Sequence, residues 1–275
     1  MRGRVDLEAP ASRYLDPSLM AGIHVLQGVD ASERVTVRQL LSHTSGIADY
    51  FEQPRRSGSN VLKDLLREDF AWTLADVLDI AKTEMSPRFA PGAPGKAFYS
   101  DTNYQLLGAV IESICGCTYE AALTERIIGP LGLTDTYPFT LETLSSYPTI
   151  APVLYGKAPV AMPRAMASFR ADGGIVSNAV EGAAFLEAFM TGRLFDAVHL
   201  GDMQKVWRPI FFPLTYGVGM MRFKLPRLFT LWQKVPAMIG HSGASGALLF
   251  PCAGAGSPMS RAVSIRSSTG ACRST

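Results

Sequence analysis

Long apolar runs are absent from this 275-residue sequence. No stretch of about 18 apolar residues, the length that a membrane-spanning helix requires, occurs anywhere in it. The N-terminal segment MRGRVDLEAP also has no apolar signal region, so neither a membrane span nor a secretory signal is predicted, and a cytoplasmic location is the default. With 47% hydrophobic and 18% charged residues, the chain is expected to be globular.

Acidic residues are absent from the C-terminal part of the chain. Residues 203–275 contain nine basic side chains and no acidic one, whereas residues 1–202 contain 17 basic and 24 acidic ones. This asymmetry favours an anionic partner near the C-terminal part, either a substrate carboxylate or something larger. Because basic residues such as Arg222 and Lys224 alternate with apolar ones, as in a half-solvated strand, nucleic-acid binding is not indicated.

Cysteine is scarce, and its spacing excludes two common kinds of site. A Cys-Gly-Cys triplet lies at 115–117, far in sequence from Cys252 and Cys272. This pattern matches neither a disulfide framework nor a tetrahedral zinc site, so all four cysteines are predicted to be free thiols. His24 and His199 have no second ligand at a useful spacing and are expected on the surface. No metal or organic cofactor is implied.

The first half of the chain is predicted to consist of helices joined by Gly/Pro loops. Thr36 and Gln39 have capping-box spacing and predict a short helix, which Gly46 is expected to end. Thr73 and Asp76 have the same spacing and open a second helix with one apolar face. These signals place helices between about 30 and 200.

Three further helices are indicated later in this region. One is predicted over Thr102–Cys115 and ends at Gly116. Thr118 caps the next, which is expected to stop before the pair 129–130 because proline cannot continue a helix. Asn178 opens another.

Short apolar or alternating runs follow residue 215, with turn residues between them: YGVGMMRF, LFTLWQ, AMIGHSG and SGALLF. They predict antiparallel strands at about 215–250, and residues 1–250 are expected to form one domain of the α/β (α+β) class. The Pro-rich stretches 86–95 and 138–163 are interpreted as loops. Residues 251–275 lack periodicity and aromatic side chains and are predicted to be an irregular tail.

Six sequence segments carry a family resemblance. They are VTVRQLLSHTSGIADYF (35–51), FAPGAPGKAFYSDTNYQLLGAVIES (89–113), YEAALTERIIGPLGLTDTY (119–137), ADGGIVSNAVEGAAFLEAF (171–189), YGVGM (216–220) and GHSGASGALLF (240–250). In this order and spacing, the chain resembles the superfamily of serine β-lactamases, penicillin-binding proteins and esterases of the class C type. The resemblance implies a β-lactamase/transpeptidase-like fold and acyl-enzyme chemistry on a small ester, amide or peptide.

The resemblance also implies site residues. The triplet Tyr99-Ser100-Asp101 matches the family's Tyr-x-Asn element, with Tyr99 as general base, Asp101 beside it and Ser100 in substrate binding. A tyrosine can act as a base only if nearby cations lower its pKa from about 10, and the family supplies that cation from the lysine of its Ser-x-x-Lys motif. His43, in the SHTSG loop, is expected to be a structural residue bonded to its own loop.

The triplet His241-Ser242-Gly243 matches the family's Lys-Thr-Gly element, which implies a catalytic role for His241 and substrate binding for Ser242 and Gly243. Gly243 would let an acyl substrate lie against the strand edge, where backbone N–H groups help to stabilise an oxyanion. Asp101 replaces an amide donor by a negative charge, and His241 replaces a permanent cation. Both departures shift the expectation from β-lactam hydrolysis toward esterase or peptidase-like activity.

The largest departure is a missing motif. No serine in the chain is followed by a lysine three residues later, so Ser-x-x-Lys is absent. In the family this motif lies upstream of a segment like the one that begins here at Gly3, and we therefore expect the chain to start after the nucleophile. Losing the nucleophile costs about 10⁶ in turnover. The missing strands would also expose a sheet edge for self-association.

Two alternatives remain open at this stage. The segment Gly240–Ala244 nearly spells the G-x-S-x-G nucleophile elbow of an α/β-hydrolase, but no Asp, Glu or His follows Gly243 to complete a triad in that order. The second alternative is a pseudoenzyme that keeps the cleft for binding, or a non-functional gene fragment. The Ser/Arg/Gly-rich sequence after Phe250, where the family continues with a strand, indicates a frameshift or gene-model error.

Overall fold

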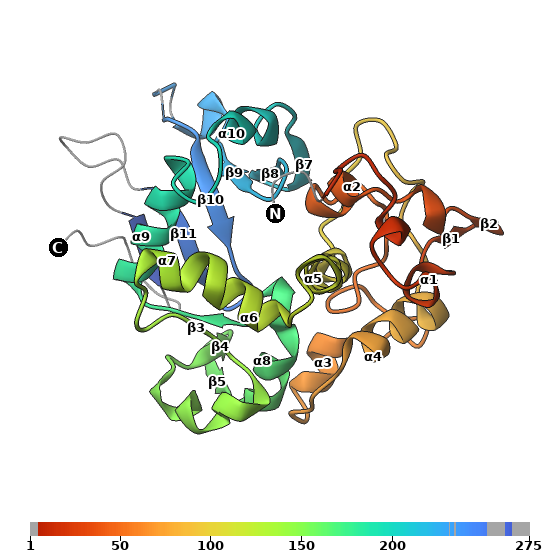
Figure 1. Cartoon of the computed structure of the whole chain (residues 1–275), viewed down its shortest axis with the longest axis horizontal. Helices are drawn as coiled ribbons and strands as arrows, with labels where there is room; N and C mark the ends of the chain where they lie inside the picture. The colour runs from red at the N-terminus through yellow and green to blue at the C-terminus, as the bar shows by residue number, and fades with distance from the viewer. Residues whose placement is uncertain (1–4, 231, 234, 252–261, 266–275) are drawn as a thin grey trace. The chain divides into compact units, whose positions relative to one another are not determined.

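The computed structural model describes residues 5–230, 232–233, 235–251 and 262–265. The chain forms two compact units, which are each assembled from several stretches of sequence (Figure 1). The first unit comprises Met1–Thr124, Pro138–Tyr147 and Met162–Gly174. The second unit comprises Glu125–Tyr137, Pro148–Ala161 and Ile175–Thr275.

The first unit is mainly helical. Its elements are η1 (Ala11–Arg13), α1 (Pro17–Met20), β1 (Val25–Leu26), β2 (Val29–Asp30), η2 (Ser32–Arg34), α2 (Val37–Leu41), α3 (Val61–Leu65), α4 (Leu74–Asp79), η3 (Ile80–Glu84), α5 (Asp101–Cys115), α6 (Tyr119–Leu123), α8 (Pro163–Phe169) and η6 (Arg170–Asp172). Two further segments, η4 (Thr124–Ile128) and η5 (Leu141–Thr149), begin in this unit and end in the second.

Helix α5 is the centre of the first unit. Its residues Leu106, Leu107 and Val110 are buried in one apolar cluster with Leu40 of α2 and Leu78 of α4. The predicted helix over 102–115 is therefore confirmed to within one residue, and it ends at a left-handed glycine as expected. This burial fixes the N-terminus of α5, whose first residue, Asp101, is the last of the Tyr99 triplet.

The predicted capping boxes are present. Thr36 and Gln39 bond reciprocally at the start of α2, and Thr73 and Asp76 do so at the start of α4. Helix α2 ends at Leu41, five residues before the glycine that was expected to end it. The caps set where a helix begins, whereas its end depends on what packs against it.

Two predictions in this region are wrong. His24 is fully buried rather than on the surface, because its Nε2 lies 2.8 Å from the carbonyl oxygen of Phe89. The helix after Thr118 does not stop before the pair 129–130: it continues as the π-helical turn η4 and then as α7 (Gly129–Leu131). Pro130 lies in the first turn of α7, where a missing N–H costs little.

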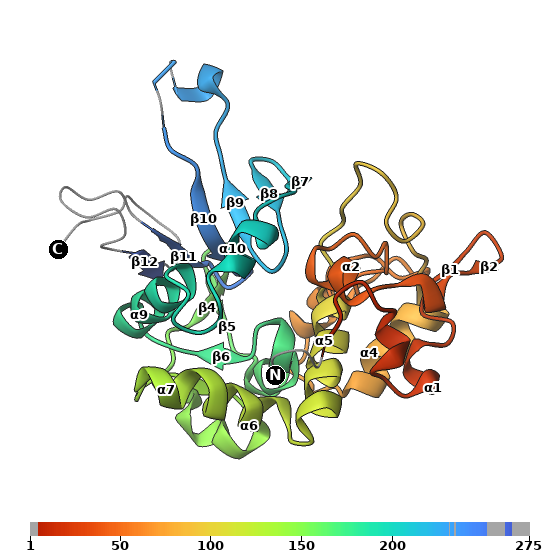
Figure 2. The ribbon, with the colours of Figure 1, turned by 45° about the horizontal axis from the view of Figure 1, so that its top comes forward.

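The second unit is built around a sheet (Figure 2). Its helices are α7, α9 (Ala179–Met190) and α10 (Val198–Met203). The six strands of the sheet, in chain order, are β7 (Arg208–Phe211), β8 (Leu214–Tyr216), β9 (Met221–Phe223), β10 (Met238–Ser242), β11 (Ala247–Pro251) and β12 (Ala262–Ile265). Smaller pairs are formed by β4 (Val153–Tyr155) with β5 (Ala158–Val160), and by β3 (Tyr137–Pro138) with β6 (Ile175–Val176).

The sheet is antiparallel and follows chain order. Each of β7 to β12 pairs with its sequence neighbour, so simple turns suffice to connect them. Helix α9, which Asn178 caps as predicted, packs against β11 and β12. Leu186 and Ala188 of α9 are buried, as are Tyr216 and Met221 of the strands. The predicted antiparallel region thus exists and extends beyond both expected limits.

Three expectations about this unit need correction. The LFTLWQ segment was predicted as a strand, but η7 (Arg227–Thr230) is a 3-10 turn. The stretch 138–163 holds η5 and the β4–β5 pair and is not only loop. Residues 262–265 pair with β11 in the predicted irregular tail, while 252–261 and 266–275 lie outside the described residues. A sheet edge supplies hydrogen-bond partners that periodicity does not reveal.

Two further expectations concern cysteine and membranes. Cys115 and Cys117 are thiols rather than a disulfide, while Cys252 and Cys272 lie outside the described residues. Within the described residues, no single helix is long and apolar enough for a membrane crossing, although α5 and the helical segment Tyr119–Leu131 meet that test jointly, with a bend of 77° between them.

Candidate functional site

The triplet Tyr99-Ser100-Asp101 lies at the N-terminus of α5 and is held by the loop at residues 43–49. The backbone N–H of Ser100 donates to Nδ1 of His43, 3.1 Å away, and the Ser100 hydroxyl donates to the carbonyl oxygen of Ala48. His43 is buried with φ of 55°. It has the structural role that was expected, although its ring bonds a segment 57 residues away rather than its own loop.

Tyr99 packs against His43, with ring centroids 4.3 Å apart. Burial raises the pKa of the Tyr99 phenol well above its usual value of 10, and the nearby Asp101, Tyr104, Asp172 and Asp49 raise it further. A phenol in these surroundings stays protonated at neutral pH and donates a hydrogen bond. The general-base role of Tyr99 remains a prediction that requires a cation to reverse these effects.

Substrate binding by Ser100 remains a prediction, and the contacts that the structure shows for this residue are internal. Its side chain is fully buried, and its hydroxyl is already bonded within the protein. Thr102 bonds the same Ala48 oxygen and accepts from the N–H of Tyr50. These bonds fix the loop against the first turn of α5.

Acidic side chains surround Asp101. Its N–H donates to Asp49 Oδ1 at 2.9 Å, and the other oxygen of Asp49 accepts from the N–H of Glu52 at 2.7 Å. Burial raises the pKa of Asp101 well above its usual range, and the charges of Asp49, Asp172 and Glu52 add to the effect. Burial likewise raises the pKa values of Asp49 and Asp172. We call Asp49, Asp101 and Asp172 the carboxyl cluster.

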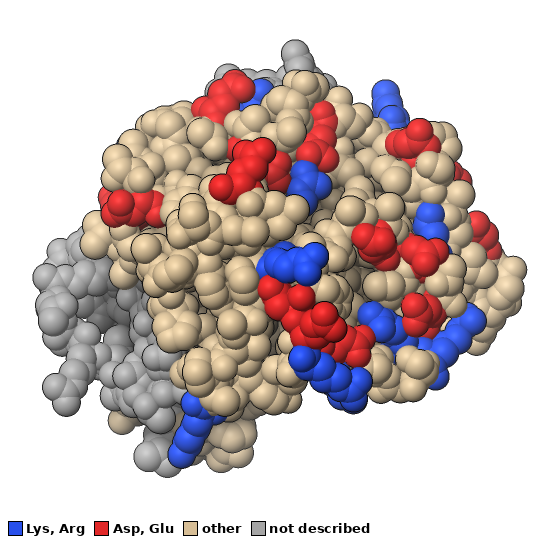
Figure 3. Space-filling view, turned by 90° about the horizontal axis from the view of Figure 1, so that it is seen from below, with Lys and Arg blue, Asp and Glu red and all other residues tan. Residues whose placement is uncertain are grey.

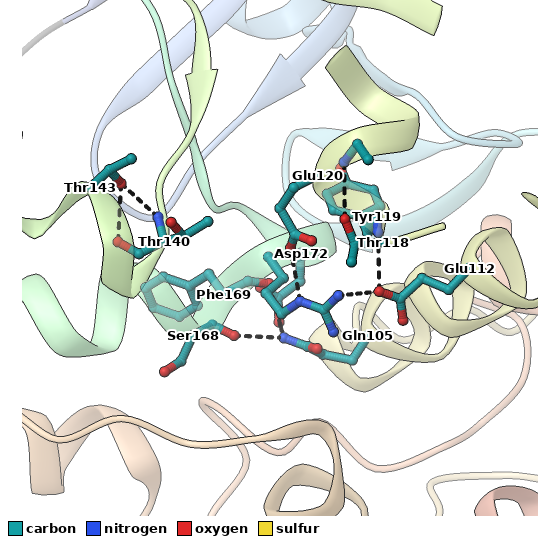
Figure 4. Close-up of polar contacts among 12 residues, drawn as sticks. Gln105, Glu112, Thr118, Tyr119, Glu120, Thr140, Thr143, Ser168, Phe169 and Asp172 are labelled. Carbon is teal, nitrogen blue, oxygen red and sulfur yellow. Dashed lines mark hydrogen bonds and ion pairs between the residues drawn. The ribbon is translucent and has the colours of Figure 1, made fainter. Parts of the chain in front are cut away.

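Asp172 is held from Gln105 of α5, as Figure 4 shows, and also from the loop that precedes α3. Its Oδ2 accepts from the hydroxyl of Tyr50 at 2.9 Å and from Nε2 of Gln105 at 3.0 Å. The same amide nitrogen of Gln105 also donates to the carbonyl oxygens of Ser168 and Phe169. Oδ1 of Asp172 is buried with no hydrogen-bond partner among the described residues.

Arg170 fastens the segment just before Asp172. Its Nε donates to Glu120 at 2.9 Å and its Nη2 to Glu112, whose carboxylate also accepts from the N–H of Tyr119 (Figure 4). The Arg170 side chain is 29% exposed. Although burial works against it, the hydrogen bond from Arg170 holds the pKa of Glu120 below its usual range. Carboxylates from α5 and α6 therefore form ion pairs with the same guanidinium group.

The backbone at Arg170 is strained. Its φ of 47° and ψ of −110° lie outside the regions that residues with a side chain normally occupy. A tight turn lies at residues 170–174, because the amide of Gly174 donates to the carbonyl oxygen of Arg170 and a Cβ on Gly174 would come within 2.5 Å of Arg170 N. Within this turn Arg170 itself has a positive φ.

The carboxyl cluster predicts a pH-dependent stability. A carboxyl whose pKa is raised on folding stabilises the folded state below the unfolded pKa near 4, and this contribution is lost as pH rises through the folded pKa. We expect Asp101→Asn to unfold at nearly the wild-type temperature at acidic pH and to be more stable by about 1 kcal/mol at pH 8. Thermal unfolding followed by circular dichroism across this range measures the difference.

The matched control is Asp79→Asn, at an exposed position of α4. It removes the same charge without touching the cluster and should follow the wild-type curve at every pH. A stability gain that is the same at acidic and alkaline pH, or that appears equally in the control, would contradict the raised pKa values.

The second predicted triplet, His241-Ser242-Gly243, lies at the end of β10 in the second unit. Nε2 of His241 is 3.2 Å from the hydroxyl of Tyr216, and the Ser242 hydroxyl donates to the sulfur of Met221 at 3.3 Å. Burial lowers the pKa of His241 below its usual value. The imidazole is therefore neutral at pH 7, which is consistent with the expected loss of a permanent cation at this position.

Gly240, directly before this triplet, and Gly243, its last residue, differ in how closely other atoms approach them. A Cβ on Gly240 would lie 1.9 Å from the carbonyl oxygen of Leu249, so β10 and β11 approach closely only because no side chain is there. A Cβ on Gly243 would meet nothing closer than Ser245 Oγ at 3.5 Å. Gly243 is exposed, and its N–H donates to the carbonyl oxygen of Ala247. Its substrate-binding role remains a prediction.

Among the described residues, no group of three His, Cys, Asp or Glu side chains has a geometry that could hold a metal ion. His199, which was expected on the surface, is exposed there. The first unit offers a protonated phenol beside buried carboxyls whose pKa values are raised. In the second unit it is a neutral imidazole at the end of a strand.

Comparison with models of known protein families identifies the family of this chain. The profile of the beta-lactamase family matches residues 1–257. The chain belongs to the beta-lactamase family. The resemblance seen in the sequence is therefore confirmed, as is the α+β fold with helices and an antiparallel sheet.

Relatives of the family include enzymes that hydrolyse and enzymes that transfer acyl groups. The chain is 34% identical to "Monacolin J acid methylbutanoyltransferase" of Aspergillus terreus over 146 residues, which cover 49% of this chain and 32% of the relative. It is 25% identical to "Putative penicillin-binding protein PbpX" of Bacillus subtilis over 223 residues, covering 79% and 47%. The chain thus spans less than half the length of these two curated relatives.

A solved structure agrees with this assignment. The D-stereospecific amidohydrolase from a Streptomyces species matches with a TM-score of 0.67 and 28% identity, covering 88% of this chain and 69% of the other. Taken together, the comparisons place the chain in a hydrolase and acyltransferase family.

Sequence reasoning did not single out two members of the carboxyl cluster. Asp49 lies within the 35–51 segment that carries the resemblance, and Asp172 lies within the 171–189 segment. The two are 123 residues apart and meet through Tyr50, whose hydroxyl bonds Asp172. The acidic residue next to a glycine pair is the local feature that marks Asp172, and it is also common in turns.

Proposed function

We propose that this chain belongs to an enzyme that hydrolyses or transfers the acyl group of a small ester, amide or peptide through an acyl-enzyme, and that the 275-residue chain by itself forms no acyl-enzyme. The family supports the reaction class. The names of the relatives support acyl compounds as substrates, since they include an amidohydrolase and a methylbutanoyltransferase. Esters or amides rather than β-lactams are favoured by Asp101 and His241, which depart from the family's Asn and Lys.

The observation that carries the second half of the proposal is the surroundings of Tyr99. Burial and neighbouring carboxyls raise the pKa of its phenol, which is the opposite of what a general base needs. The sequence contains no Ser-x-x-Lys motif to supply the opposing ammonium group. Nucleophile and base act as a unit, so without them only residual rate is expected.

The first test is covalent labelling of the purified chain. We expect no serine adduct by intact mass after incubation with a fluorescent penicillin or a p-nitrophenyl ester, and hydrolysis of the ester at the buffer rate. Ser242→Ala serves as the matched variant, since Ser242 occupies the serine of the competing G-x-S-x-G reading. A stoichiometric adduct that disappears in Ser242→Ala would overturn the proposal.

A second test addresses the binding role that a pseudoenzyme would keep. Calorimetry with D-phenylalanine amide and with its N-acetyl derivative asks whether the chain retains a saturable site for an amide. Saturable binding that is weakened by Tyr99→Phe supports a retained acyl pocket. If neither compound binds, the chain has lost the pocket as well as the nucleophile.

We also propose self-association through a strand edge. Strand β7 is the last strand on one side of the sheet and pairs only with β8 among the described strands. Pro209 in this strand removes one donor and limits the pairing. Sedimentation velocity over a range of concentrations should show a weak monomer–dimer equilibrium, and a sharp monomer at all concentrations would contradict it.

A further inference from the structure

The chain between β9 and β10 exposes apolar side chains at its tip. Figure 2 shows this segment projecting beyond the ends of the two strands in the second unit. We define the hairpin patch as five side chains that are each at least 45% exposed: Phe212 (67%), Leu228 (70%), Phe229 (64%), Trp232 (73%) and Val235 (45%). Phe212 comes from the turn between β7 and β8, and its ring centroid lies 5.4 Å from that of Phe229.

Single exposed apolar residues are ordinary. Here Phe212 and Phe229 are in ring contact, and the segment that carries Phe229 also exposes a tryptophan and two aliphatic side chains, an exposed apolar set typical of an interaction site. Aromatic side chains of this kind are enriched where proteins meet the interface of a lipid bilayer. The patch therefore has the composition expected of a segment that inserts into the interface of a lipid bilayer.

The charged residues that the described part of segment 224–237 carries are basic. Lys224 and Arg227 are exposed there, and Arg222 in the adjoining strand stacks on the ring of Trp207 at 4.6 Å. No acidic residue occurs anywhere in residues 203–275. By contrast, acidic and basic side chains are interspersed across the face shown in Figure 3. An exposed apolar segment with basic residues such as Lys224 and Arg227 is complementary to an anionic lipid surface.

We propose that the hairpin patch docks the protein on an anionic membrane surface, with the aromatic tip entering the interface and the basic residues facing the lipid headgroups. A second copy of the chain is the less suitable occupant, because a symmetric contact would bring Arg227 and Lys224 of both copies together. This inference is independent of the proposed function, since it uses residues outside both predicted triplets.

The test is vesicle cosedimentation of the full chain. Vesicles of phosphatidylcholine with about 30% phosphatidylglycerol are compared with vesicles of phosphatidylcholine alone. We expect the affinity for the anionic vesicles to be at least about tenfold higher and to fall with added salt. The emission of Trp232 should shift to the blue on binding, and Trp232→Phe should remove that shift.

Matched variants distinguish vesicle binding through the hairpin patch from nonspecific adsorption of the protein to lipid. Phe229→Ser is expected to weaken vesicle binding about tenfold, because a phenylalanine side chain no longer leaves water. Val180→Ser, at a 79% exposed position of α9 in the same unit, should bind as the wild type does. Lys224→Gln should weaken binding to anionic vesicles only. Circular dichroism and thermal unfolding establish that each variant is folded.

Three outcomes would overturn the proposal. One is equal affinity for the two kinds of vesicle, or none for either. Another is an equal effect of Phe229→Ser and Val180→Ser. The third is a dimer in sedimentation velocity that Phe229→Ser dissociates while vesicles remain unbound, since the patch would then contact a second copy.

Discussion

Replacing Gly240 by alanine is expected to destabilise the second unit by about 3 kcal/mol, the largest effect among the stability variants considered. The added Cβ would lie 1.9 Å from the carbonyl oxygen of Leu249, a backbone atom that cannot rotate away, and 2.9 Å from Phe250 Cδ1. Strands β10 and β11 would have to separate at the point where β10 enters the His241 triplet. Urea unfolding followed by circular dichroism measures the loss.

Gly243→Ala is the matched control three residues later. Its Cβ would meet no atom within 3.4 Å, and the φ of Gly243 is not in the left-handed region, so the change should stay within about 0.5 kcal/mol. Equal destabilisation by the two variants would show that the strands do not approach as described. The same pair is informative for function, because only Gly243→Ala can alter substrate binding while the sheet remains intact.

The second large effect is expected at Arg170, where Arg170→Ala should cost about 2 kcal/mol. Removing the guanidinium leaves Glu112 and Glu120 facing each other without their shared partner. Breaking a buried pair typically costs about 3 to 5 kcal/mol, and the partial exposure of Arg170 reduces this figure. Arg67→Ala, at a 78% exposed residue 3.9 Å from Asp64, should cost almost nothing.

A third variant separates the ion pairs from the backbone strain. Arg170→Gly loses the same guanidinium but adopts φ of 47° and ψ of −110° without a Cβ clash. We therefore expect Arg170→Gly to be about 1 kcal/mol more stable than Arg170→Ala, the reverse of the usual order. If the alanine variant is the more stable one, the strain at this residue is not real.

The strain has a consequence for the carboxyl cluster. The turn at Arg170–Asp172 presents Asp172 to Gln105 and Tyr50, and the two ion pairs hold that turn in place. Loss of Arg170 should therefore also weaken the pH dependence predicted for Asp101→Asn. A protein tolerates strained backbone where the surrounding contacts over-determine it, as the carboxylates do here.

Local signals predicted the helix starts well. The capping boxes at Thr36 and Thr73, and the single cap at Asn178, are all present, because a cap depends on side chains within three residues of one another. The helix before Gly116 was predicted to within one residue because its apolar periodicity and its left-handed terminal glycine are local signals as well. Where the outcome depended on distant partners, as for buried His24, the prediction was wrong.

The sequence by itself determined the family and the positions of two motif triplets, because these depend on residue order alone. It also determined the charge asymmetry and the absence of a Ser-x-x-Lys motif. Only the tertiary structure decided that Tyr99 lies among carboxyls, since Asp49 and Asp172 are brought to Asp101 by the packing of loops against α5. Electrostatic effects act through space, so groups that are far apart in sequence determine whether the phenol of Tyr99 is protonated.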